Sequence, residues 1–247
     1  MITNNLSLVC SSLPPHVTLV AVSKYHPVEA LQEAYEAGQR IFGESRENEL
    51  KVKVEALPQD VEWHFIGHLQ TNKVKYLAPV VSLIHSIDSE RLLDEVERQA
   101  VRFHEERVQR FASVADSATL GTLSDGRIPV LLQLHVAQEE TKSGFSPQEL
   151  IALLSSNDIR KRWPHVSLRG LMGMASFVDD EAQWRQEFRQ ITACQRALLD
   201  GPLQVQGFSP TDFPILSFGM SDDYPVAIQE GANMVRVGTA IFGARQY

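Results

Sequence analysis

VTLVAVSKYHP, residues 17–27, joins a β-rich run to the start of a helix without any spacer. The run is apolar and rich in valine, which is typical of a strand that is buried on both faces of a parallel sheet. Pro27 suits a first helical turn, and Leu31 and Tyr35 continue one apolar face until Gly38 ends the pattern. A strand that passes directly into an amphipathic helix is the repeating unit of a parallel α/β fold.

The same strand-then-helix pattern recurs along the whole chain. We expect eight strands, at residues 17–23, 40–44, 61–67, 81–87, 128–136, 166–175, 214–219 and 233–238. Eight such units in 247 residues match one closed (β/α)8 TIM barrel, which typically takes ~250 residues. An open, doubly wound sheet is the alternative, although no Gly-x-Gly-x-x-Gly turn follows any strand. Residues 108–127 break the pattern, and we expect a surface insertion there within one domain, residues 1–247.

The composition excludes several classes of protein. A net charge of -8 at pH 7 argues against a nucleic-acid partner, which needs a clustered excess of Lys and Arg. Two cysteines, Cys10 and Cys194, are too few for a disulfide framework and fit a reducing compartment. No stretch has the length of a transmembrane helix, and the N-terminus lacks the pattern of a signal peptide. We therefore expect a cytoplasmic protein with no membrane partner.

The C-terminal ends of the strands are where a barrel of this type carries its active site. Lys24 directly follows the first strand, in AVSKYHP, and its ammonium is expected to enter the mouth of the barrel. Burial there favours the neutral amine, which can attack an aldehyde or a ketone. The alternative is a lysine that extends along the rim and keeps its ammonium in water.

Two segments near the C-terminus predict a phosphate site. Barrels often bind phosphate between the loops after strands seven and eight and a short helix. Ser221 is expected to cap a helix that begins at Asp222, and Gly238 and Thr239 open the last helix. Hydroxyls and free N–H groups at these positions suit a phosphate dianion. The competing interpretation is an ordinary N-cap at Ser221 and an ordinary turn glycine at Gly238.

A reactive lysine opposite a phosphate site predicts a phosphorylated carbonyl compound as the ligand. Pyridoxal phosphate (PLP), held as a Schiff base on Lys24, and a sugar phosphate in an aldolase both meet this description. Arg236, in the eighth strand, would place a permanent cation beside a pyridine nitrogen and keep that nitrogen unprotonated. Such a ring is a weak electron sink, which disfavours extensive carbanion chemistry. Alternatively, Arg236 pairs with a core carboxylate such as Glu44.

The histidines and the second helix carry weaker signals. His64 lies inside the third strand, where a core or rim position is the ordinary interpretation and contact with a bound ring is the alternative. The Lys- and Glu-rich residues 46–55 are expected to form a solvated helix face. No Gly-x-Ser-x-Gly elbow indicates a hydrolase. We expect no metal site, because Cys or carboxylate partners at ligand spacing are missing beside His26, His68, His85 and His135.

Short motifs in a fixed order give the chain a resemblance to a known family. They are AVSK at residues 21–24, FGE at 42–44, WHFIGHLQTNK at 63–73, HSID at 85–88, KSG at 142–144, RGLM at 169–172, GMSDD at 219–223 and VRVGTAIFGAR at 235–245. Together they resemble the pyridoxal phosphate homeostasis protein family over nearly the whole chain. That family is similar in fold to the N-terminal barrel of alanine racemase and usually stands alone as a single barrel.

The resemblance implies a set of cofactor-binding residues. Lys24 would hold PLP as a covalent aldimine, and Arg236 would lie near the pyridine nitrogen. His64 would approach the ring. The phosphate would be surrounded by Ser221, Gly238 and Thr239, and the pocket would be lined by Ser217 and Met220. The sequence departs from many members of the family at residues 45–46, where Ser-Arg stands in place of Asn-Tyr.

The resemblance also implies a function. Alanine racemase receives a second acid or base from an additional β domain, whereas this sequence ends with the barrel at Tyr247. One face of the cofactor would then stay open, so the implied role is that of a carrier or regulator in intracellular PLP homeostasis without an established turnover. The alternatives are a PLP-dependent amino-acid racemase or lyase and a sugar-phosphate aldolase. Apo PLP enzymes would receive the cofactor, and a monomer is expected.

Overall fold

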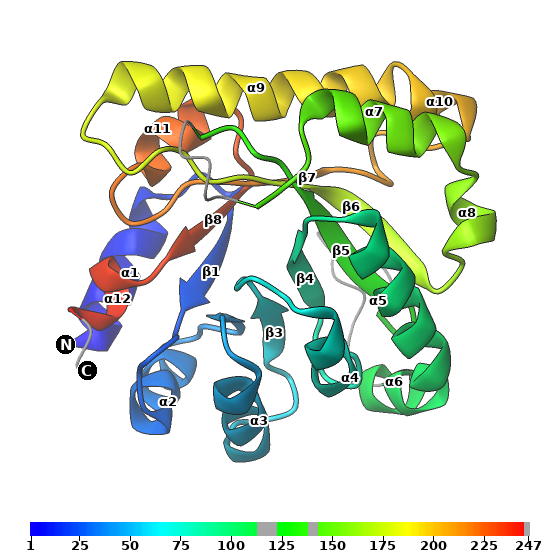
Figure 1. Cartoon of the computed structure of the whole chain (residues 1–247). Coiled ribbons are helices and arrows are strands. Elements are labelled where there is room, and N and C mark those ends of the chain that lie inside the picture. Colours follow the sequence, from blue (N-terminus) through cyan, green and yellow to red (C-terminus); the bar gives the residue numbers. More distant parts are fainter. Residues whose placement is uncertain (113–122, 138–142, 245–247) are drawn as a thin grey trace.

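The computed structural model is a closed barrel of eight parallel strands surrounded by helices (Figure 1). It describes residues 1–112, 123–137 and 143–244. The strands pair in sequence order, and the last one closes the barrel against the first, which excludes the open sheet. The strands are β1 (Thr18–Val22), β2 (Ile41–Glu44), β3 (Glu62–Phe65), β4 (Leu83–Ile87), β5 (Ile128–Gln133), β6 (Val166–Met172), β7 (Ile215–Ser217) and β8 (Met234–Val237).

The helices cover the outer face of the barrel, and α9 runs along one side of it (Figure 1). Within the described residues, no helix is long and apolar enough to cross a membrane. The helices are α1 (Ile2–Ser12), α2 (Val28–Glu36), α3 (Glu47–Ala56), the 3-10 turn η1 (Thr71–Lys73), α4 (Val74–Leu77), α5 (Glu90–Arg102), α6 (His104–Phe111), α7 (Pro147–Ser156), α8 (Ile159–Arg162), α9 (Glu181–Leu199), α10 (Pro202–Val205), α11 (Tyr224–Gln229) and α12 (Thr239–Phe242).

Each of the eight strands lies within its predicted span, and most of them end earlier than predicted. Strand β5 ends at Gln133 and β6 at Met172, although the apolar pattern continues in both. The reason is that Val136 and Ala175 are still buried in the core after strand pairing has ended. An apolar run therefore predicts burial correctly and overestimates the length of the paired strand.

Helix α1 was not expected from the sequence. It buries Leu6 and Val9 and lies against α12, where the Asn5 side chain donates a hydrogen bond to the Ile241 carbonyl at 3.1 Å. Two buried side chains in a polar segment are a weak periodic signal, because a helix that packs on a surface usually shows a wider apolar stripe. The contact joins the two ends of the chain (Figure 1).

The prediction of a surface insertion at residues 108–127 was wrong for its flanks. Val108 to Phe111 form the last turn of α6, and Phe111 and Leu123 are both buried. They pack with residues of the barrel interior, among them Leu131. Residues 113–122 lie outside the described part of the chain. Phe111 and Leu123 stand among mostly polar residues, so the sequence pattern did not indicate their contacts with the core.

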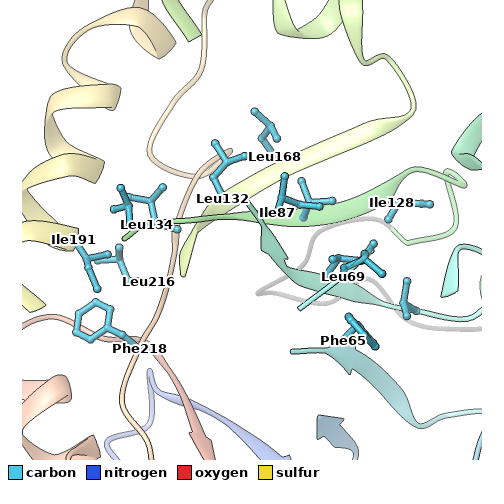
Figure 2. Close-up of a cluster of buried hydrophobic side chains, with 14 of the residues drawn as sticks. Phe65, Leu69, Ile87, Ile128, Leu132, Leu134, Leu168, Ile191, Leu216 and Phe218 are labelled. Carbon is cyan, nitrogen blue, oxygen red and sulfur yellow. The ribbon is translucent and has the colours of Figure 1, made fainter. Parts of the chain in front are cut away.

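Apolar side chains form two separate clusters. The larger cluster lies between the barrel wall and the helices, and Figure 2 shows Leu216 and Phe218 beside Ile191 of α9. The smaller cluster fills the barrel interior with one residue each from six strands: Val20, Leu83, Leu131, Met172, Ile215 and Met234. Burying one such side chain stabilises the fold by roughly 1.5–3 kcal/mol.

Candidate functional site

A cavity of about 310 Å³ opens at the C-terminal ends of the strands. The register of β1 and β8 pairs Val20 with Arg236, so the segments that follow both strands meet at this end of the barrel. The cavity brings together six of the eight predicted cofactor-binding residues, which are Lys24, Met220, Ser221, Arg236, Gly238 and Thr239. The other two, Ser217 and His64, are completely buried and are not part of the cavity lining.

The cavity has further lining residues that sequence reasoning did not single out. Val22, Ile66 and Met174 lie at or just beyond strand ends, so the strand-end rule could have found them. Phe177 gave no periodic signal, because its side chain lies in the loop before α9 and is 90% exposed. The remaining two members of the lining are His26 and Asp222.

Lys24 is carried by a turn with unusual backbone geometry. It follows the buried Ser23 and precedes Tyr25, which has a φ of 67°. Positive φ is uncommon for residues other than glycine, and it is costly for a bulky side chain. Conformations of this kind persist only where the surroundings hold them, and they are frequent at functional sites.

The prediction that the Lys- and Glu-rich residues 46–55 form a solvated face was wrong for Lys53 of α3, whereas Arg46, Lys51 and Glu55 are exposed. The side chain of Lys53 is 5% exposed, and its ammonium donates to the carboxylate of Glu44 at 2.8 Å. A buried ion pair and a solvated pair use the same residue types, so the sequence pattern did not separate them. Glu44 is not the partner of Arg236, because Glu44 Oε2 makes no hydrogen bond within the described residues and Arg236 bonds Ser217 and Gly173. Burial raises the pKa of Glu44, and Lys53 opposes this rise.

Arg236 lines the cavity from β8 and is held by three hydrogen bonds. Its Nη1 donates to the carbonyl and to the hydroxyl of Ser217, each at 2.8 Å, and its Nη2 donates to the Gly173 carbonyl at 3.0 Å. Burial lowers the pKa of Arg236 to about 10, and Asp223 opposes this effect, so the guanidinium is charged at neutral pH. A guanidinium has five N–H donors, which leaves donors for a ligand that only accepts.

Two histidines extend this network into the barrel. Because Arg236 can only donate, the Ser217 hydroxyl accepts from it, and the same hydroxyl shares a hydrogen bond with His85 Nδ1 at 3.1 Å. The Nε2 of His85 shares a further hydrogen bond with Nδ1 of His64 at 3.0 Å. Donation from Ser217 toward His64 leaves the Nε2–H of His64 without an acceptor among the described residues, and donation in the opposite direction leaves the Ser217 hydroxyl hydrogen without one, so the tautomers of the two histidines decide the direction.

Both imidazoles are neutral. Burial lowers the pKa of His64 to about 3 and that of His85 well below its ordinary value, with further lowering of the latter by His64 and Arg236. The Nε2 of His64 is buried and makes no hydrogen bond within the described residues. The role of His85 could not be predicted from the sequence, because a single strand histidine gives the same pattern whether it bonds Ser217 beside Arg236 or only fills space.

The loop between β7 and α11 forms one wall of the cavity. Its Ser221 was expected to cap α11, but the N-cap of that helix is Asp223, which accepts the Met220 N–H at 2.5 Å. The Ser221 Oγ instead accepts the N–H of Gly238 at 3.2 Å, so this hydroxyl links the two predicted phosphate loops. A hydroxyl that accepts one bond still has its own hydrogen to donate to a ligand.

Glycine is required in this wall at Gly219. Its φ is +95°, and a Cβ at this position would lie 2.6 Å from the Cβ of Ala227. The Gly219 carbonyl accepts the N–H of Arg236 at 2.9 Å. The first two N–H groups of α12, those of Thr239 and Ala240, have no acceptor within the helix, whereas those of Ile241 and Phe242 donate to the Gly238 carbonyl. Hydroxyl and N–H donors therefore converge on the side of the cavity where a phosphate was expected.

A larger cavity of about 620 Å³ adjoins the first one. The two share Phe177, Met220, Ser221 and Asp222, and the larger one extends toward Trp184 of α9. Within the described residues, no group of three or more His, Cys, Asp or Glu side chains is placed to hold a metal ion. The smaller cavity is the candidate site, because it contains the lysine and the arginine.

Comparisons with known proteins agree with this geometry. The family model described as alanine racemase, N-terminal domain, matches residues 1–246. A protein of Aquifex aeolicus named pyridoxal phosphate homeostasis protein is 39% identical over 230 residues, which are 93% of this chain and 87% of that protein. PipY of Synechococcus elongatus, solved with PLP bound, is 33% identical with a TM-score of 0.77, and the match covers 98% of this chain and 100% of PipY.

The likeness extends more weakly to a solved alanine racemase of E. faecalis. That enzyme is 18% identical with a TM-score of 0.70, and the match covers 98% of this chain and 57% of the enzyme. At this level of identity the likeness shows a shared fold alone.

Proposed function

This chain belongs to the pyridoxal phosphate homeostasis protein family, and from this premise we propose that the mouth of its barrel binds PLP and that the protein serves intracellular PLP homeostasis. One observation carries the proposal: a single cavity combines Lys24, the buried cation of Arg236 and the linked loops of Ser221 and Gly238. The PLP-bound structure of PipY, which matches nearly the whole chain, supports it.

The residues of the cavity fit the three functional groups of PLP. When bound, the cofactor supplies an aldehyde that condenses with a primary amine, and Lys24 is the one lysine among the described residues of the lining. Arg236 offers donors to an unprotonated pyridine nitrogen. Ser221 and Thr239 offer hydroxyl and N–H donors to the phosphate. A cavity of about 310 Å³ lies within the usual size range of small-ligand sites.

The same lining favours a carrier over a racemase or lyase. A donor-only arginine beside the pyridine nitrogen keeps the ring a weak electron sink. Among the described lining residues there is no Tyr or Cys, and no second lysine, to act as a base on the other face of the ring. Incubation of the PLP-loaded protein with amino acids in deuterated water tests this point. Exchange of the α-proton would indicate the enzyme, and its absence is expected.

The substitution Lys24→Ala tests the covalent link. Wild-type protein mixed with PLP should show the absorbance of a lysine adduct, and mass spectrometry after borohydride reduction should place a pyridoxyl group on Lys24. Lys24→Ala should lose both signals. Lys51→Ala, an exposed change on α3, is the matched control and should keep them. A wild-type protein that takes up no PLP would refute the proposal, and an adduct on a different lysine would refute the role of Lys24.

Three further parts of the proposal concern the setting of the protein. Apo PLP enzymes are the proposed recipients of the cofactor, the chain is proposed to act as a monomer, and a cytoplasmic location is proposed with it. Light scattering on the purified protein measures its oligomeric state. Recovery of activity by an apo-enzyme mixed with the loaded protein, compared with the same amount of free PLP, measures transfer.

A further inference from the structure

The turn that carries Lys24 is tied to a buried ionic cluster outside the barrel wall. The centre of the cluster is Lys53 of α3, whose side chain is 5% exposed, and its main partner is Glu44, whose side chain is completely buried. The Lys53 ammonium lies 2.8 Å from Glu44 Oε1 and 3.4 Å from Glu49 Oε2. A buried charge is tolerated only where its partners hold it in good geometry, so these side chains have fixed positions.

The cluster forms hydrogen bonds with the residues on both sides of Lys24, Ser23 and Tyr25. On the preceding side, Lys53 Nζ donates to the Ser23 carbonyl at 2.9 Å, and the Ser23 hydroxyl donates to Glu44 Oε1 at 2.5 Å. On the following side, the N–H of Tyr25 donates to Glu49 Oε2 at 2.8 Å. Every one of these contacts is made by a direct neighbour of Lys24.

These contacts matter because the Ser23–Tyr25 turn has an unfavourable backbone conformation that needs support from its surroundings. Tyr25 has a positive φ of 67°, which an aromatic residue rarely adopts without support from its surroundings. Its N–H is bonded to Glu49, and the guanidinium of Arg46 stacks over its ring at 4.6 Å. Both supporting side chains come from the N-terminal end of α3, next to the helix turn that carries Lys53.

We propose that Lys53 is a positioning residue, which directs the amine of Lys24 toward the cavity by holding the Ser23–Tyr25 turn through Glu44 and Glu49. The proposal rests on the PLP site proposed above. Lys53 does not line the cavity, so its loss affects the orientation of Lys24 and leaves the phosphate loops and Arg236 in place. The covalent link should therefore weaken more than the noncovalent contacts.

Two ligands separate these effects. PLP has the aldehyde that reacts with Lys24, whereas pyridoxine 5'-phosphate has the same ring and phosphate without an aldehyde. Equilibrium dialysis of both ligands against wild-type protein and Lys53→Met should show that PLP affinity falls about tenfold or more, as expected when a reacting group loses its orientation. The affinity for pyridoxine 5'-phosphate should change by no more than about twofold. Lys51→Met, an exposed change on the same helix, should leave both affinities unchanged.

The outcomes distinguish this proposal from a structural role and from failure of the PLP site. An equal loss of both affinities in Lys53→Met, or no loss of either, would overturn the positioning role. Wild-type protein that binds neither ligand would refute the PLP site itself. If Lys53→Met does not fold, Glu49→Gln is the second variant, because it keeps an acceptor for the Tyr25 N–H while it weakens the ionic cluster. It should show the same preferential loss of PLP affinity, and equal losses would again overturn the proposal.

Discussion

Arg107 and Arg236 are two buried arginines at opposite ends of the barrel. Arg107 lies at the N-terminal end and donates to four backbone carbonyls, those of Ala78, Val81, Gly126 and Arg127. Arg236 lies at the C-terminal end, donates to two backbone carbonyls and to the hydroxyl of Ser217, and also lines the cavity. Burial lowers both pKa values, that of Arg107 to about 9 and that of Arg236 to about 10.

The difference shows that burial and a lowered pKa do not by themselves mark a binding residue. Four of the five donors of Arg107 are used by carbonyls that precede β4 and β5, so this arginine ties together the segments that enter those strands. Arg236 keeps donors at the end of the barrel where loops meet. Spare hydrogen-bonding capacity at the mouth distinguishes a ligand residue from a structural one.

The largest expected effect is on stability, at Arg107. Arg107→Leu would leave four backbone carbonyls without their donors, so the free energy of unfolding should fall by about 3–5 kcal/mol. Urea unfolding measures this change, and Arg91→Leu, an exposed change on α5, is the control. The PLP affinity of the folded Arg107→Leu protein should match that of the wild type. A large loss of affinity without a loss of stability would reverse the roles assigned to the two arginines.

A smaller effect, on ligand affinity, is expected at Arg236, at the C-terminal end of the barrel. Arg236→Gln removes a charge-assisted hydrogen bond of about 1.5–3 kcal/mol, which corresponds to a roughly ten- to hundredfold weaker binding of PLP. Fluorescence titration with PLP measures it. The free energy of unfolding should fall by less than in Arg107→Leu, because water in the cavity can reach the groups that Arg236 leaves. Unchanged affinity with a large loss of stability would make Arg236 a second structural arginine.

The effect that is smallest near neutral pH concerns the neutral histidines that continue the hydrogen-bond network of Arg236. The pKa of His64 is lowered from 6.5 to about 3. Between these two pH values the unfolded chain therefore binds a proton at His64 that the folded chain does not. Stability is therefore lost as the pH falls below about 6.5, by up to about 1.4 kcal/mol per pH unit from this group. Urea unfolding at several pH values should give a shallower slope for His64→Gln than for wild type. Equal slopes would mean that His64 is protonated in the folded state.

Much of the fold was predictable because its signals are local. Eight apolar runs, each followed by a helical pattern, predicted the closed barrel. The start of α7 shows how local such signals are, because Ser146 and Glu149, three residues apart, form a capping box there. Helix α1 and the core contacts of Phe111 and Leu123 were missed, because each depends on a few apolar side chains within polar segments.

The candidate site was predictable where a residue's place along a strand decides its role. Lys24 and Arg236 were found by that rule, and the structure brings both to the cavity. The rule failed where the partner decides the role. Ser221 bonds the N–H of Gly238 instead of capping a helix, and Lys53 is buried beside Glu44 instead of solvated.

The sequence by itself determined that strands and helices alternate in eight units and that Lys24 follows the first strand, because these properties depend on periodicity and on neighbours along the chain. The pairing of β1 with β8, which closes the barrel, came from the tertiary structure. The tertiary structure alone decided which charges are buried and what they contact. It brought the Lys53 cluster of α3 next to the Lys24 turn and linked Arg236, Ser217, His85 and His64 in one chain of hydrogen bonds. Hydrogen bonds between distant segments have no periodic signature, and they set the orientation and the proton positions on which the site depends.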